Sequence, residues 1–246
     1  MQLDVDIAGK SFIGATGKPH QVLAAISFSL ATSEVGVVVG PSGCGKSTML
    51  RILAGLDPNY QGRVMRPIGA RLAMVFQEPR LLPWRSVEDN VRLAAPGIDD
   101  ARLAALFSVL ELSAHREHYP GELSLGLARR VALARAFAIE PDFLILDEPL
   151  ASLDDALAAR LRDEIAALVG NRPMITILVT HNLDDAVRLG DKLIVLSERP
   201  ARLLYMLPIA TPRAARNEQT LAAIKADIIR LNVANSSGAA DAGRDE

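Results

Sequence analysis

The nine residues from 40 to 48, GPSGCGKST, carry the most specific chemical signal in the chain. They match the phosphate-binding pattern G-x-x-x-x-G-K-[ST] in full. In this pattern the backbone N–H groups of a glycine-rich turn surround phosphate oxygens, and the next helix adds the positive end of its dipole. Lys46 would reach the β- and γ-phosphates, and the Ser47 hydroxyl would bind Mg²⁺. The predicted nucleotide contacts are Gly40, Pro41, Ser42, Gly43, Cys44, Gly45, Lys46, Ser47 and Thr48.

A second candidate site lies at the end of the apolar segment Phe143–Leu146, where Asp147 and Glu148 follow. In a phosphate-loop enzyme the first carboxylate of such a pair helps to hold Mg²⁺. The neighbouring glutamate can orient or deprotonate the attacking water. Strands that end in acidic residues are common, so the prediction depends on the phosphate loop in the same chain. Asp147 and Ser47 are the predicted metal ligands, and Glu148 is the predicted base.

The elements that must position these residues alternate between strand and helix patterns. Val35–Val39 leads into the phosphate loop as a strand, and Ser47–Leu56 leads out as a helix. From residue 77 to 140, apolar residues recur at three- and four-residue spacing, which is typical of helices. Strands that alternate with helices predict a parallel α/β sheet. The remaining expected elements are strands at Leu3–Ile7, Val22–Leu30, Leu72–Phe76, Phe143–Leu146, Met174–Thr180 and Leu193–Leu196, and a helix at Asp155–Val169.

The net charge and composition of the chain limit the classes of molecule that it is expected to bind. The chain has 246 residues and a formal net charge of −2, so no electrostatic attraction to nucleic acid is expected. Its single cysteine, Cys44, excludes an internal disulfide and fits a reducing compartment. The first ten residues lack the basic and apolar regions of a signal peptide, and no run approaches 18 apolar residues. We therefore expect neither a signal peptide nor a transmembrane segment.

The order of the motifs resembles the ATP-binding subunit of an ABC transporter, from about residue 3 to about residue 200. The resemblance rests on VFQEP around Gln77, on LSLGL followed by ARRVALARAFAIEPDFLILDEP, on ASLD ending at Asp154, and on VTHNLDDA around His181. It implies a P-loop NTPase core with a mostly parallel sheet, an N-terminal antiparallel β-subdomain and an inserted α-helical subdomain. The expected core is 1–76 and 141–205, the helical signature subdomain is 77–140, and 206–246 holds a C-terminal helix. The last dozen residues, small and polar, are expected to be disordered.

The same resemblance assigns roles to single residues. Phe12 would stack on adenine, and Gln77 would contact the metal and sense the γ-phosphate. His181 would lie near the γ-phosphate, and Asp154 would belong to a loop that crosses a dimer interface. Taken alone, a glutamine, a histidine or an aromatic residue is more often structural. The implied catalytic set is Glu148, Lys46, Gln77 and His181, with Ser47, Gln77 and Asp147 at the metal and Ser124 and Gly126 at the nucleotide of the opposite subunit.

One segment departs from the family pattern. The family signature is Leu-Ser-Gly-Gly-Gln, whereas residues 123–127 are LSLGL, so Leu125 replaces a glycine and Leu127 the glutamine. Leucine keeps a Cβ where backbone must approach phosphate, and it cannot complete a Ser-x-x-Gln capping box. Arg129 also stands where the family usually has glutamine. Either two equal subunits hydrolyse slowly, or a partner chain supplies an intact signature; we expect the slow homodimer.

A narrower resemblance concerns the partner. VFQEPRLLPW, then SVEDNV, then the Ser197–Pro200 segment are similar to the nitrate, sulfonate and taurine importer group. Trp84 would then face the permease, whereas the alternative is an aromatic packed between helices. The implied function is ATP hydrolysis with Mg²⁺ at the cytoplasmic face of the membrane, which energises import of a small anionic or sulfonate-like solute. The implied partners are permease subunits, a second ATP-binding subunit and, indirectly, a solute-binding protein.

Three other functions stay open at this point. The first is a subunit that binds ATP but hydrolyses it weakly, in a regulatory or asymmetric role, which the altered signature favours. The second is an ABC-type ATPase outside transport, although such proteins usually carry two nucleotide domains or a long coiled-coil insertion. The third is another phosphate-loop class such as a GTPase, against which the absence of an Asn-Lys-x-Asp motif argues.

Overall fold

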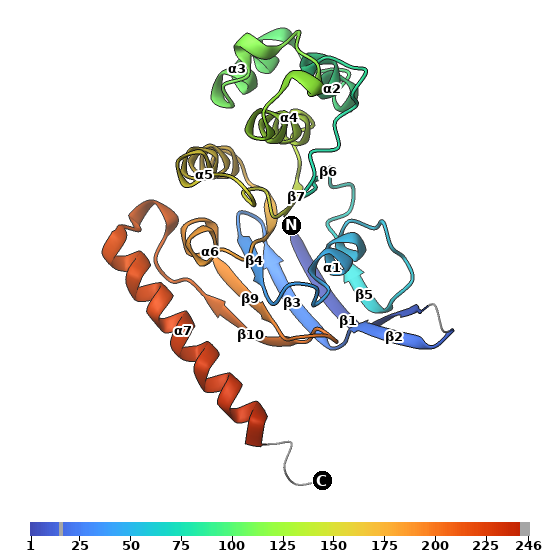
Figure 1. Cartoon of the computed structure of the whole chain (residues 1–246), viewed down its shortest axis with the longest axis vertical. Coiled ribbons are helices and arrows are strands. Elements are labelled where there is room, and N and C mark those ends of the chain that lie inside the picture. The colour runs from blue at the N-terminus through green and yellow to red at the C-terminus, as the bar shows by residue number, and fades with distance from the viewer. Residues whose placement is uncertain (15–16, 242–246) are drawn as a thin grey trace.

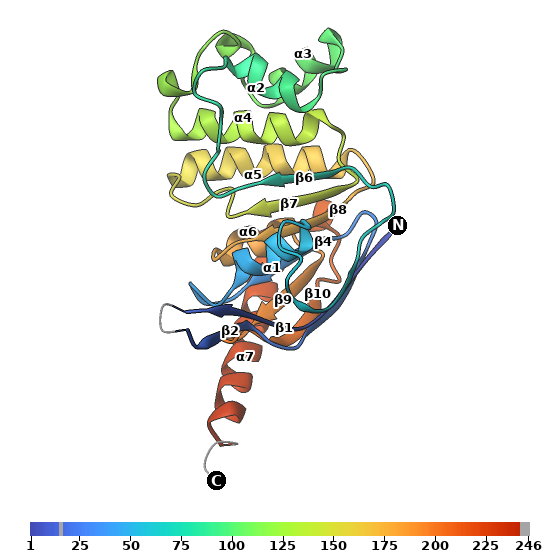
Figure 2. The ribbon, with the colours of Figure 1, turned by 90° about the vertical axis from the view of Figure 1, so that its right-hand side faces the viewer.

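Two sheets and a group of helices build the molecule. The computed structural model describes residues 1–14 and 17–241, and for residues 231–241 it describes the backbone alone. An antiparallel sheet packs on one face of a larger, mostly parallel sheet, and helices cover the other face (Figures 1 and 2). This is the α/β arrangement that the sequence predicts, so the fold class is confirmed.

The larger sheet has the strand order β10-β9-β4-β8-β7-β6. β10 runs antiparallel to β9, and the other neighbours are parallel. Phe143 and Ile145 belong to one hydrophobic cluster, Leu144 and Leu146 to the other. Both faces are thus buried, which explains why these strands are continuous apolar runs. The strands are β4 (Val35–Val39), β6 (Leu72–Val75), β7 (Phe143–Asp147), β8 (Ile175–Val179), β9 (Lys192–Leu196) and β10 (Leu203–Pro208).

The smaller sheet is antiparallel and centres on β1, which pairs with β2, β3 and β5. The expectation of one strand at Val22–Leu30 is wrong, because this stretch is divided between β2 and β3. The break comes at Ala24, whose N–H donates to the carbonyl of Ala201. The four strands are β1 (Gln2–Ile13), β2 (Pro19–Leu23), β3 (Ile26–Ala31) and β5 (Gln61–Met65).

Some helices pack against the larger sheet, and others form a separate layer. α2, α3 and α4 lie together at one end of the molecule in both views. α1 ends at Leu53, earlier than the expected Leu56, because Gly55 adopts a φ of 75° that stops the helix. The helices are α1 (Lys46–Leu53), α2 (Val87–Ala94), α3 (Asp100–Val109), α4 (Leu125–Ala138), α5 (Asp155–Gly170), α6 (Leu183–Leu189) and α7 (Glu218–Asp241), with 3₁₀ turns at Ser113–His115, Pro120–Glu122 and Arg213–Ala215.

The C-terminal region differs in part from the expectation. α2 to α4 fall within 77–140, the predicted helical subdomain, and the exact boundaries stay predictions. Disorder was expected from residue 235 onward, but α7 continues to Asp241. The alanines in this stretch favour helix, which offsets the small polar residues around them. Residues 242–246, the rest of the predicted disordered tail, lie outside the described residues. Among the described helices, none combines the length and apolar composition of a membrane span.

Candidate nucleotide-binding and catalytic site

The phosphate loop, residues 40–45, connects the end of β4 to α1. Gly43 and Gly45 have φ values of 73° and 129°, which residues with a Cβ rarely adopt. A Cβ on Gly45 would also lie 2.7 Å from Leu23 Cδ2. Cys44 is buried in the core between the sheets, where it packs as a small apolar residue. The glycines are therefore required by backbone geometry and by packing against β2.

The first turn of α1 has the features of an anion site. Its N-cap residue, Gly45, provides no side-chain cap, whereas the caps of α2 to α6 are Ser86, Asp99, Ser124, Asp154 and Asn182, each accepting backbone N–H bonds. The N–H groups at the start of α1 are thus left for a ligand. Lys46 is buried and its Nζ donates to the carbonyls of Gly40 and Pro41, both at 2.8 Å. The loop and the ammonium group fit a triphosphate.

Asp147 ends β7 and lies beside α1. Burial raises the pKa of its carboxyl above the ordinary value, a hydrogen bond with Ser47 opposes this, and the charge of Glu148 adds to it. The described residues contain no group of three or more His, Cys, Asp or Glu side chains that could hold a metal. Mg²⁺ instead commonly takes one or two carboxylates, with substrate phosphates and water as its other ligands. The adjacent oxygens of Ser47 and Asp147 fit that pattern.

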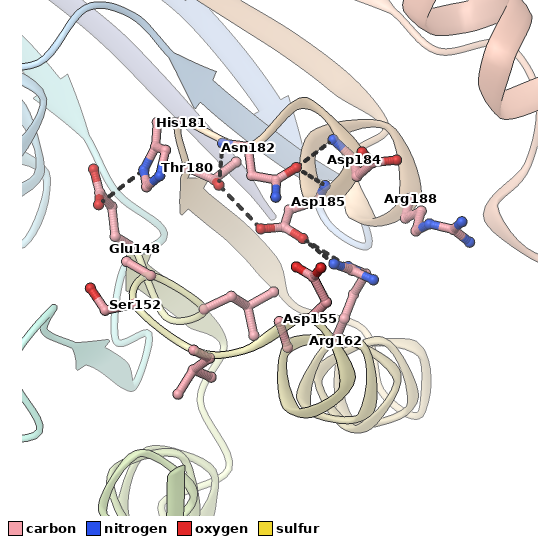
Figure 3. A pocket seen from close by; sticks show the side chains of 14 residues that line it. Glu148, Ser152, Asp155, Arg162, Thr180, His181, Asn182, Asp184, Asp185 and Arg188 are labelled. Carbon is pink, nitrogen blue, oxygen red and sulfur yellow. Dashed lines mark hydrogen bonds and ion pairs between the residues drawn. The ribbon is translucent and has the colours of Figure 1, made fainter. Parts of the chain in front are cut away.

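Glu148 occupies a strained position directly after β7. Its φ is 47°, and its N–H donates to the carbonyl of Val179 at the end of β8. His181 follows β8, and its Nδ1 lies 3.3 Å from Glu148 Oε2 (Figure 3). The parallel neighbouring strands β7 and β8 therefore bring together the predicted base and the histidine that is predicted to lie near the γ-phosphate.

A cavity of about 420 Å³ opens beside this pair. Its lining includes Glu148, Ser152 and His181 (Figure 3). The lining also includes a network of polar side chains that holds the segment after β8, in which His181 lies. Thr180 Oγ1 lies 3.3 Å from Asp185 Oδ2, and Arg162 Nε donates to Asp185 Oδ1 at 2.8 Å. Arg162 on α5 and Asp185 on α6 are 23 positions apart, and no motif in the sequence pairs them. Sequence reasoning missed this link between the two helices.

Other predicted residues are placed around this centre. Gln77 is exposed in a bend two residues beyond β6, at the edge of the sheet where Asp147 lies. Phe12 is 42% exposed on β1, with Lys10 Nζ 4.6 Å from its ring centroid. β1 pairs with β2, whose Val22 and Leu23 contact the phosphate loop at Gly45. Phe12 thus belongs to the sheet that packs on the phosphate loop, and Gln77 follows the strand beside Asp147. No contact in the described part of the chain assigns a role to either residue.

The signature residues lie apart from the phosphate loop of their own chain. Ser124 caps α4, its Oγ accepting the N–H of Leu127 at 3.3 Å. A Cβ on Gly126 would lie 2.6 Å from Leu157 Cδ2, so this glycine lets α4 approach α5. Asp154 caps α5 by accepting the N–H of Leu157 at 2.9 Å. In both views the helical layer that carries Ser124 is separated from α1.

The phosphate loop, the acidic pair at the end of β7 and the α/β fold together define a P-loop NTPase. The family model for ABC transporters matches residues 23–151. A Pseudomonas syringae pv. tomato protein, aliphatic sulfonates import ATP-binding protein SsuB 2, is 39% identical over 92% of this chain and 96% of its own length. The Bacillus subtilis SsuB is 37% identical over 87% and 88%. The chain belongs to the ABC transporter family and is one of its ATPase cassettes.

Solved structures agree on the fold. The dimeric bacterial ABC transporter cassette MJ0796 superposes with a TM-score of 0.74 at 23% identity, covering 86% of this chain and all of that one. A post-hydrolysis state of the same cassette, bound to ADP and Pi, gives a TM-score of 0.71 at 22% identity.

Proposed function

We propose that this chain powers the import of aliphatic sulfonates or closely related small anions. The observation that carries the solute class is the similarity, over nearly the whole chain, to proteins named for aliphatic sulfonate import. The chain would bind from the cytoplasm to permease subunits, and a solute-binding protein would act on the far side of that complex. Motion of the cassettes would be passed to the permease.

In the proposed mechanism the side chains mostly position and stabilise charge. The N–H groups of the first turn of α1 and the Lys46 ammonium group would bind the phosphates of ATP. Ser47 and Asp147 would hold Mg²⁺, which supplies positive charge to the phosphates. Glu148 would orient the attacking water and accept its proton, while His181, 3.3 Å away, keeps the carboxylate in place. Gln77, at the edge of the same sheet, would complete the polar surroundings of the γ-phosphate.

We infer that the complete site needs two copies of the chain. Ser124 caps α4 and Gly126 belongs to it, and α4 lies away from α1, the helix that follows the phosphate loop (Figure 2). A second copy facing the first would place its signature against this nucleotide, with Asp154 and Ser152 at the junction. Phe12 would stack on the adenine of the nucleotide held by its own chain. A solved cassette of the same fold is dimeric, which supports the arrangement.

Reconstitution tests the proposed solute. The chain and its permease are placed in vesicles with the solute-binding protein, and uptake of a labelled alkanesulfonate is measured with and without ATP. We expect uptake that needs ATP and that unlabelled sulfonates compete with, whereas a neutral sugar or an amino acid does not. ATP hydrolysis that never responds to sulfonate would overturn the solute class while leaving the ATPase intact.

Trp84 is the expected contact with the permease. It is 70% exposed, in the turn that precedes α2. The buried side chain of Asn90 holds this turn by accepting the N–H of Leu82 and donating to the carbonyls of Leu82, Arg85 and Ser86. An exposed indole on an anchored turn is typical of an interface rather than of a core.

Trp84→Ala is therefore expected to reduce co-purification with the permease by about tenfold, the loss of roughly 1.4 kcal/mol that a central interface aromatic commonly contributes. Its melting temperature and ATP affinity should match those of the unchanged chain, because the side chain is mostly exposed and belongs to neither hydrophobic cluster of the described residues. Leu204→Ala, an exposed residue on β10, is the matched control. A large drop in melting temperature would favour the core-packing alternative.

Leu125 is the residue on which the rate of ATP hydrolysis is expected to depend most in the signature. It is 46% exposed in the first turn of α4, where the facing subunit's phosphates would approach. Leu127 is partly buried against the core, so its replacement by glutamine changes packing as well as capping. The weakly hydrolysing, asymmetric subunit is a second candidate function because of this exposed leucine.

We expect Leu125→Gly, alone or with Leu127→Gln, to raise ATP hydrolysis in the permease complex by about tenfold or more, because losing one positioned donor typically costs 10²–10³ in rate. Leu125→Ala, which keeps the Cβ, should restore little. Equal rates in all of these variants would show that the leucines are tolerated.

A further inference from the structure

Arg129 is a buried cation behind the proposed catalytic centre. It lies on the second turn of α4, and 6% of the residue is exposed. Its Nη1 donates to the carbonyl of Pro149 at 3.2 Å, while its Nε is buried without a hydrogen-bond partner in the described part of the chain. A buried guanidinium group with an N–H donor that has no partner costs folding free energy, so its presence needs an explanation.

The surroundings of Arg129 supply that reason. Burial lowers the pKa of its guanidinium group, and the negative charge of Glu148 acts in the opposite direction. Pro149 directly follows Glu148, so the hydrogen bond holds the turn in which Glu148 has its φ of 47°. Glu148 therefore has His181 on one side and is tied through its own turn to α4 on the other.

The same helix starts at the signature. Ser124 caps α4, and Arg129 follows five positions later. A shift of α4 on contact with a facing subunit would be carried to Pro149 and the turn that bears Glu148. A glutamine here could donate one N–H to the Pro149 carbonyl, but it would bring no positive charge to Glu148.

We propose that Arg129 is a positioning residue that couples the signature end of α4 to Glu148, by holding the Glu148–Pro149 turn and attracting the Glu148 carboxylate. This inference rests on the proposed role of Glu148 as the base. It assigns to Arg129 an effect on the chemical step, through Glu148, and none on ATP binding.

The test is a double-mutant cycle in the full chain with its permease. Arg129→Met, Arg129→Gln and Arg129→Lys are each made with Glu148 and with Glu148→Gln, and kcat, KM for ATP and melting temperature are measured. Arg160→Met, which removes an exposed arginine from α5, is the matched control. Arg129→Gln and Arg129→Lys keep a polar donor, and they carry the test should Arg129→Met fail to fold.

With Glu148 present, we expect Arg129→Met to lower kcat by about tenfold or more, because small misplacements of a reacting group cost up to 10² in rate, while KM stays nearly constant. Arg129→Lys should recover most of the rate and Arg129→Gln less. With Glu148→Gln, Arg129→Met should cause no further loss, since residues that act as a unit are not additive.

Any of the following results would overturn the inference. One is an unchanged kcat in Arg129→Met. Another is an equal loss with and without Glu148, or a loss that follows KM and melting temperature, because it would mean a purely structural role. The last is a wild-type rate in Glu148→Gln alone, which would remove the base itself and is seen separately from the arginine variants.

Discussion

Glu148→Gln is expected to slow ATP hydrolysis by about 10²–10⁴-fold and to leave ATP affinity close to that of the unchanged chain, because an amide cannot accept the proton of the attacking water. The geometry that motivates this expectation is local. Glu148 follows β7 in a left-handed conformation and its Oε2 lies 3.3 Å from His181 Nδ1. Glutamine keeps the size of the side chain, so binding and fold should be preserved.

The measurement is steady-state phosphate release at saturating ATP and Mg²⁺, together with the dissociation constant for ATP. Glu198→Gln, the same chemical change on an exposed loop, is the matched control and should hydrolyse ATP normally. A Glu148→Gln rate equal to that of the unchanged chain would place the base elsewhere in the site.

Lys46→Ala should lower hydrolysis by 10²-fold or more, since one preorganised charge or donor at a phosphate is worth about 10²–10³ in rate. Lys46 Nζ now donates to the carbonyls of Gly40 and Pro41 at 2.8 Å, and phosphate oxygens would replace these acceptors when ATP binds. Alanine provides no cation to the β- and γ-phosphates. Unlike Glu148→Gln, this variant should also lose the rise in melting temperature that ATP gives.

Thermal unfolding with and without ATP separates the two variants. A ligand at 100 times its dissociation constant adds about 2.7 kcal/mol to stability, so its loss is readily measured. Lys18→Ala, an exposed lysine of the β1–β2 hairpin, is the control. Full turnover of Lys46→Ala at saturating ATP would contradict the assignment of the phosphate loop.

Much of the fold could be predicted because its signals are local. The strand–loop–helix around Gly40–Thr48 and the strand before Asp147 are continuous patterns, and the structure has both. The split at Ala24 was not predicted, since Val22–Leu30 is apolar enough for one strand and the break depends on Ala201, far along the chain. Strand β10 is likewise defined by its pairing with β9 rather than by a pattern of its own.

The candidate site likewise has some features that the sequence predicts and others that it does not. The family resemblance put His181 near the γ-phosphate and Glu148 at the attacking water, and the structure places the two side chains 3.3 Å apart. The Arg162–Asp185 pair and the Arg129–Pro149 hydrogen bond join residues 23 and 20 positions apart. Packing of helices fixes such contacts, and no spacing in the sequence encodes them. The roles of Phe12, Gln77, Ser124 and Asp154 stay predictions, because those depend on a nucleotide and a second chain.

The central proposal is that two copies of this chain enclose ATP between the phosphate loop of one and the signature of the other. The most direct measurement is sedimentation of the Glu148→Gln chain with ATP and Mg²⁺, combined with the amount of nucleotide bound. We predict a species with the mass of two chains that carries two ATP molecules, and its loss when Lys46→Ala is added. A Glu148→Gln chain that binds ATP fully and stays a monomer, both alone and in the permease complex, would contradict the proposal.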